Sequence, residues 1–102
     1  MLVQVVIFLE QEPLFELGEV YATDGAVETL QALNVDPASL IIRHVLGDWS
    51  ELPEEDQETN KRAIKQGNMI LSSYTLPDEQ TKIWIITEWD RSATTILLPE
   101  EY

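Results

Sequence analysis

The order of the local sequence patterns constrains the fold of this chain more than any other feature. Three helix-like segments come first, and three strand-like segments follow them. Thr23 and Asp36 are typical N-cap residues, and Gly47 and Gly67 are typical residues at which a helix ends. The predicted helices cover residues 23–33, 36–46 and 53–66.

The strand-like segments cover residues 69–76, 82–88 and 94–98. Short turns separate them, and short connections favour antiparallel neighbours. The middle segment is apolar on both faces, which predicts a central strand with Trp84 in the core. Residues 1–9 and 18–22 also have strand character. We therefore expect one α+β domain over residues 1–102: a short N-terminal β element, three helices and a three-stranded antiparallel β-meander packed on the helices.

The charge of the chain restricts its partners. It carries 19 Asp and Glu residues against 6 Lys and Arg, a formal net charge of −13. Such a field repels nucleic acids and anionic membranes and attracts basic surfaces. We therefore expect no direct nucleic-acid binding and no membrane contact, and predict a basic protein partner. The predicted binding residues lie in and after an acidic stretch that has no base: Asp48, Trp49, Glu51, Glu54, Glu55, Asp56, Glu58 and Trp89.

The apolar N-terminal stretch does not predict a signal or membrane segment. It lacks a basic n-region and a small-residue cleavage site, and it is far shorter than the roughly 20 residues that cross a bilayer. We expect a cytoplasmic protein. The chain has no cysteine, which excludes disulfides and thiol catalysis, and its single histidine excludes a histidine-cluster metal site. No metal or other cofactor is predicted.

His44 is the one ordinary candidate for acid–base chemistry near neutral pH. It lies near the end of a predicted helix, and Asp48 follows four residues later, close enough to hydrogen-bond it. In the structural interpretation His44 caps the helix end or bridges to a carboxylate. In the catalytic interpretation it acts with an arginine that pairs with a phosphate and with sheet hydroxyls. The residues of that alternative site are His44, Asp48, Ser72, Tyr74, Arg91 and Thr95.

Residues 18–102 resemble a family of small proteins carried by plasmids, phages and other mobile elements. The resemblance rests on residues 43–49, on residues 84–88, 90–92, 94–95 and 97–102, and on Glu55, Asp56, Asn60, Gly67, Leu71, Ser72 and Tyr74. Members are often labelled "plasmid-related protein" or "type I restriction endonuclease subunit M". This chain departs from the family pattern at Ser50, where the family has glycine, and at residues 68–69, where it commonly has arginine. It also lacks the glycine motif of a methyltransferase. The resemblance implies a mobile-element setting and brings no established activity.

Three functional hypotheses follow from the sequence. The first is a non-enzymatic accessory protein that binds a basic partner, as a nucleic-acid mimic or an inhibitor of a host defence or DNA-processing complex. The second is a small ribonuclease similar to barnase or EndoU that uses His44. The third is a structural or regulatory homodimer that pairs through a sheet edge or the apolar N-terminal strand.

Overall fold

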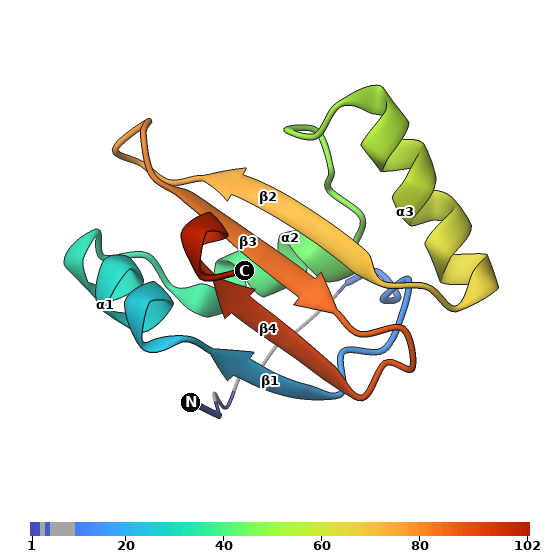
Figure 1. Cartoon of the computed structure of the whole chain (residues 1–102), viewed down its shortest axis with the longest axis horizontal. Helices are drawn as coiled ribbons and strands as arrows, with labels where there is room; N and C mark the ends of the chain where they lie inside the picture. The colour runs from blue at the N-terminus through green and yellow to red at the C-terminus, as the bar shows by residue number, and fades with distance from the viewer. Residues whose placement is uncertain (3, 5–9) are drawn as a thin grey trace.

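The computed structural model describes residues 1, 2, 4 and 10–102, and its architecture is α+β, as predicted. Helices α1 and α2 cover one face of a four-stranded sheet and lie behind it in Figure 1. Helix α3 runs beside the edge strand β2, and the short 3₁₀ helix η1 lies over the other face. The elements in chain order are β1 (Glu19–Ala22), α1 (Asp24–Ala32), α2 (Pro37–Val45), α3 (Glu54–Gln66), β2 (Ile70–Thr75), β3 (Lys82–Thr87), β4 (Ala93–Leu97) and η1 (Pro99–Glu101).

The three helices are confirmed, with ends that differ from the prediction by at most one residue. The Thr23 hydroxyl accepts the backbone N–H of Ala26, and the Asp36 carboxylate accepts that of Ala38. These bonds satisfy donors that a helix start leaves unpaired. Gly67 ends α3 with φ 72°, a left-handed conformation that glycine adopts without steric cost.

The prediction of a three-stranded sheet is wrong. Strands β2, β3 and β4 pair antiparallel in sequence order, but β1 joins β4 in parallel, so the sheet is mixed and its order is β1-β4-β3-β2. Strand β1 was predicted as a separate N-terminal element. Its partner follows more than 70 residues later, after all three helices, and a local sequence pattern does not report so distant a pairing.

Gly18 allows β1 to begin beside the turn between β3 and β4. Its φ is +66°, and a Cβ built there would lie 2.3 Å from the backbone oxygen of Ser92. The next residue, Glu19, donates its N–H to that same oxygen at 3.0 Å. A side chain at position 18 would therefore clash with the turn that aligns β1 with β4.

The core lies between the sheet and the helices. The main cluster joins β1 and the sheet centre to α1 and α2. A second cluster joins the end of α2 and the start of β2 to α3. The buried residues of the two clusters are Val20, Ala22, Ala26, Leu30, Leu40, Ile41, Tyr74, Leu76, Ile83, Ile85 and Ile96 in the first, and Phe15, Val45, Trp49, Ala63 and Ile70 in the second.

Both outer edges of the sheet carry hydrogen-bond partners. Met1 bonds β1 through its terminal amine and its carbonyl, both to Ala22, and Leu2 bridges antiparallel to Tyr21. The rest of the strand predicted over residues 1–9 lies outside the described residues, apart from position 4.

None of the described helices combines the length and the apolar character needed to cross a membrane.

Candidate functional site

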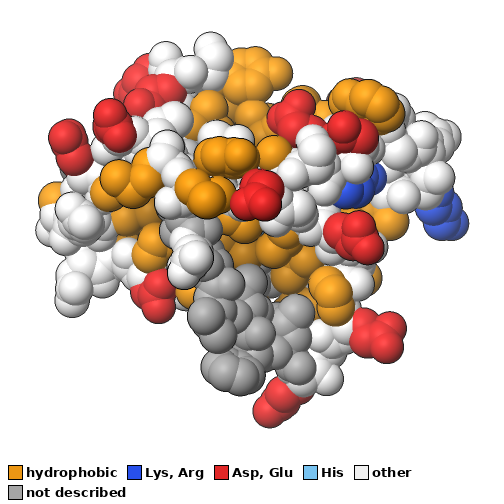
Figure 2. Space-filling view, turned by 90° about the horizontal axis from the view of Figure 1, so that it is seen from below, with side chains coloured by type: hydrophobic (Ala, Val, Ile, Leu, Met, Phe, Trp, Pro, Cys, Tyr) orange, Lys and Arg blue, Asp and Glu red, His pale blue; other side chains and the backbone are white. Residues whose placement is uncertain are grey.

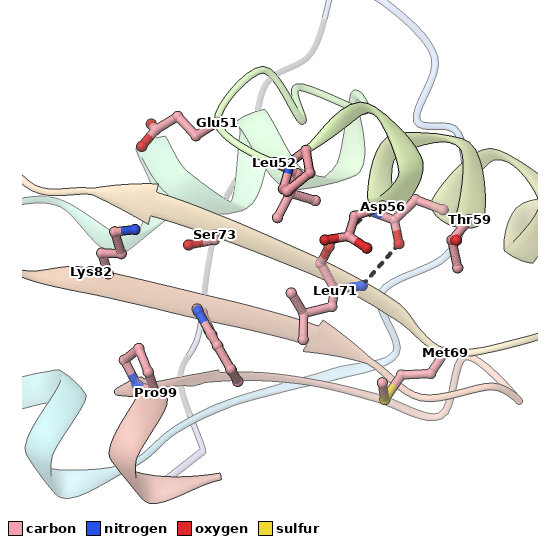
Figure 3. A pocket seen from close by; sticks show the side chains of 12 residues that line it. Glu51, Leu52, Asp56, Thr59, Met69, Leu71, Ser73, Lys82 and Pro99 are labelled. Carbon is pink, nitrogen blue, oxygen red and sulfur yellow. Dashed lines mark hydrogen bonds between the residues drawn. The ribbon is translucent and has the colours of Figure 1, made fainter.

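The candidate site is a groove of about 510 Å³ on the sheet face that α1 and α2 leave uncovered. Figure 3 shows it between α3, the sheet and Pro99. Its floor comes from Leu71 and Ser73 of β2 and from Trp84 of β3. The lining residues are Glu51, Leu52, Pro53, Asp56, Thr59, Asn60, Met69, Leu71, Ser73, Lys82, Trp84 and Pro99. Grooves of this size, with apolar surface and a few polar groups, are typical ligand sites.

Asn60 fixes the α3 wall of this groove to the sheet. Its side-chain amide donates to the Leu71 carbonyl at 2.8 Å and accepts the Leu71 N–H at 3.3 Å. The amide thus replaces the next strand at the edge of β2. Asn60 is buried, and a buried amide needs hydrogen-bond partners, which the two backbone groups of Leu71 supply.

The carboxylates around the groove differ in how they are paired. Glu51 accepts the backbone N–H of Thr75 at 2.8 Å and also faces Arg43 at 3.3 Å. The Asp56 carboxylate makes no hydrogen bond or ion pair with any residue that the structure describes. In Figure 3 its carboxylate points over Leu71, whereas Glu51 and Lys82 lie at the other end of the groove. One end therefore has an unpaired negative charge above an apolar floor.

His44 lies away from the groove and is fully buried beneath the sheet, within a chain of hydrogen bonds. Its Nδ1 lies 2.5 Å from the Ser72 hydroxyl, and its Nε2 lies 2.8 Å from the Thr87 hydroxyl. Trp49 donates its indole N–H to Ser72 at 3.0 Å. On the other side, Thr87 contacts Thr94 at 2.7 Å, and the Thr94 hydroxyl donates to the carbonyl of Leu17.

The donors and acceptors in this chain of bonds can be assigned for a neutral imidazole, starting from the carbonyl of Leu17. Because Thr94 donates to a carbonyl, its oxygen accepts from Thr87, whose own oxygen must then accept Nε2–H of His44. Nδ1 of His44 accepts from Ser72, whose oxygen takes the indole proton of Trp49. Burial lowers the pKa of the imidazole to about 3, so the ring is neutral near pH 7 and its single N–H proton lies on Nε2. His44 is structural in this arrangement.

Asp48 does not hydrogen-bond His44, contrary to the prediction. Its carboxylate instead lies 2.7 Å from Nε of Arg43, and that bond is the main cause of the lowered pKa of Asp48. The backbone carbonyl of Asp48 accepts the hydroxyl proton of Tyr74 at 2.8 Å. Tyr74 is buried, which raises its pKa to about 12, and the Arg43 guanidinium lies 4.2 Å from its ring centre.

Arg91 also has a structural position. Its guanidinium donates to the carbonyls of Ala63 and Asn68, at 2.9 and 2.6 Å, and so ties the turn before β4 to the end of α3. It was predicted as a phosphate partner in the catalytic alternative. Thr95, the remaining member of that set, points to the opposite sheet face from His44, since it pairs with Ile86 one register step from Thr87. The six residues do not converge on one cleft.

The three tryptophans are distributed differently from the prediction. Trp49 is 5 % exposed and belongs to the second core cluster, so its predicted place on the binding surface is wrong. Trp84 is half-buried rather than in the core, because its sheet face is only partly covered. The centres of the Trp84 and Tyr102 rings lie 5.8 Å apart, with the rings steeply inclined to each other. Trp89 is 66 % exposed, and its role as a contact residue stays a prediction.

The predicted acidic binding residues stay on or near the surface. Glu54, Glu55 and Asp56 form the exposed first turn of α3, and Glu58 on the next turn pairs with Lys61 at 3.1 Å. From another side of the molecule, Figure 2 shows acidic side chains spread over much of the face, with Lys and Arg confined to one side. No group of three or more His, Asp and Glu within the described ranges is placed to hold a metal ion.

Sequence reasoning missed most of the groove. Ser73, Leu71 and Lys82 follow ordinary strand patterns, and nothing local shows that α3 leaves their face open. The signal that was present is the polar stripe of Asp56 and Asn60 on an otherwise thin apolar face of α3. Comparison of the chain with protein-family models, curated proteins and solved structures found no match.

Proposed function

We propose that this protein is a non-enzymatic binding module for a basic protein partner, with the groove between α3 and the sheet as its contact site. The observation that carries the proposal is the acidic first turn of α3 beside an apolar groove. An apolar floor supplies affinity through buried area, and the acidic wall selects cationic surfaces and speeds their association.

The pairing of the charges supports this choice of partner. The described residues contain only three ion pairs, two of which share Arg43, whereas the chain has 19 acidic residues. Most of the negative charge therefore has no internal counter-ion. The mobile-element setting implied by the resemblance is compatible with a nucleic-acid-binding host protein as the partner, bound by mimicry of its usual ligand; this stays part of the proposal.

The ribonuclease alternative has no comparable support. A general base must reach a substrate proton and carry a pKa near the working pH, but His44 is fully buried and its pKa is lowered to about 3. RNA cleavage by the purified protein that disappears in His44→Gln would nevertheless contradict the proposed function.

The proposal is tested by neutralising equal charge at two places. The site variant carries Glu54→Gln, Glu55→Gln and Glu58→Gln on α3, the helix that forms one wall of the groove. The control variant carries Glu12→Gln, Glu19→Gln and Glu28→Gln, none of which belongs to α3 or lines the groove. Binding of a capped polylysine peptide is measured by calorimetry at several salt concentrations. We expect the site variant to bind at least about tenfold more weakly than the control.

Equal losses in the two variants would mean that the peptide responds only to net charge, and the groove would then not be the contact site. Circular dichroism of both variants checks the fold. Sedimentation of the free protein, in the same buffers, tests the homodimer alternative. Edge-to-edge pairing of two copies would have to displace Met1 and Leu2 from β1, or Asn60 and Glu51 from β2.

A further inference from the structure

The two ends of the groove differ in a way that identifies what can enter it. At the Glu51 end, the carboxylate is already bonded by Arg43 and Thr75, and Lys82 lies nearby (Figure 3). At the other end, the Asp56 carboxylate has no partner among the described residues and stands over Leu71. A ligand that completes this groove therefore brings a positive group to Asp56.

The floor of the groove adds an aromatic surface. Trp84 lies on β3, half-buried, with one side turned to Tyr102 and with its ring among the residues that line the groove. The face of an indole attracts cations, and arginine uses this contact more often than lysine does. The guanidinium is also planar and weakly hydrated, and it can pair with both oxygens of one carboxylate.

The edge of β2 adds a backbone site. Leu71 and Thr75 use outward-facing backbone groups to bond Asn60 and Glu51. Backbone groups alternate along a strand, so Ser73, which lies between them, faces the same way. No described side chain bonds Ser73, and it lines the groove. One donor and one acceptor thus remain for the backbone of a bound peptide.

We propose that the groove accepts an arginine-bearing peptide segment of the basic partner. The guanidinium pairs with Asp56, its methylene groups lie on Leu71 and Trp84, and the peptide backbone bonds Ser73. This inference rests on the proposed function and names the feature of the partner that the groove recognises. An anionic ligand is disfavoured because Asp56 and Glu51 outnumber Lys82 among the charged residues of the lining.

The experiment uses the full chain and three capped pentapeptides that differ only at the centre: arginine, lysine or citrulline, the neutral analogue of arginine. Binding is followed by NMR through the indole N–H signal of Trp84 and the backbone amides of Leu71 and Ser73. We expect the arginine peptide to move these signals, the lysine peptide to bind several-fold more weakly, and the citrulline peptide to bind at least about tenfold more weakly.

A matched pair of variants tests the role of Asp56. Asp56→Asn and Glu55→Gln remove the same charge from neighbouring positions of one helix turn, but only Asp56 lines the groove. We expect about a tenfold loss of affinity in the first variant and less than about a twofold loss in the second. Trp84→Leu should also weaken the arginine peptide more than the lysine peptide.

Equal binding of the arginine and lysine peptides, equal effects of the two variants, or no shift at Trp84 would each overturn the arginine assignment. The polylysine experiment does not depend on these outcomes. If its site variant still loses affinity, the basic-partner function stands without an arginine-specific groove; if neither experiment localises binding to the groove, both proposals fail.

Discussion

Acidification should destabilise the protein through His44 alone by about 3 kcal/mol between about pH 7.5 and about pH 4.5. The imidazole has a pKa of about 3 in the folded protein because it is buried, whereas the unfolded chain has the ordinary value of 6.5. Between these two values the unfolded state binds a proton that the folded state does not. The contribution of His44 to the free energy of unfolding is therefore fully present above the unfolded pKa of 6.5 and falls as the pH drops. Below about pH 3 this group causes no further loss.

The single histidine of the chain makes this prediction unambiguous. Its imidazole signals in NMR should not titrate in the folded protein down to about pH 4.5, and they should show a proton on Nε2. Urea unfolding at a series of pH values gives the second measurement. The variant His44→Gln keeps a donor for Thr87 and an acceptor for Ser72 but removes the titrating group.

The difference between the two proteins isolates His44, because both contain the same carboxylates. The variant should be less stable at neutral pH but should lose about 3 kcal/mol less on acidification. An imidazole that titrates near its ordinary pKa, or the same pH dependence in both proteins, would refute the neutral buried histidine and reopen the catalytic alternative.

Two further predictions concern the backbone contacts that join distant segments. Arg91→Ala should cost about 1–3 kcal/mol in urea unfolding because it leaves the carbonyls of Ala63 and Asn68 without their charged donor; Arg62→Ala, on the exposed side of α3, should cost less than about 0.5 kcal/mol, and an equal cost would contradict this role. Gly18→Ala should cost about 2–5 kcal/mol, since it combines a left-handed φ with a clash against Ser92. Gly67→Ala should lower the free energy of unfolding by only about 1 kcal/mol. Gly67 has a left-handed φ like that of Gly18, but no atom lies within 4 Å of the added Cβ.

The candidate site was only partly predictable from the sequence. The charge pattern indicated the acidic helix that forms one wall. The sequence analysis grouped His44 with Ser72, and the two side chains do contact each other across a helix and a strand. However, the contact is fully buried, so His44 is a neutral structural group and not an accessible base. Burial depends on what covers a side chain from several segments at once, and a local pattern contains no such information.

The helices and the antiparallel strands were determined by the sequence itself, because caps, glycine and proline positions and apolar periodicity act over a few residues. Thr23 and Gly67 mark helix ends through contacts with residues only a few positions away. The tertiary structure alone determined the parallel partner of β1, the exposure of Trp84 and the burial of Trp49. These depend on contacts between segments far apart in the chain, where Gly18 meets Ser92 and Asn60 meets Leu71, and such contacts exist only after the whole chain has packed.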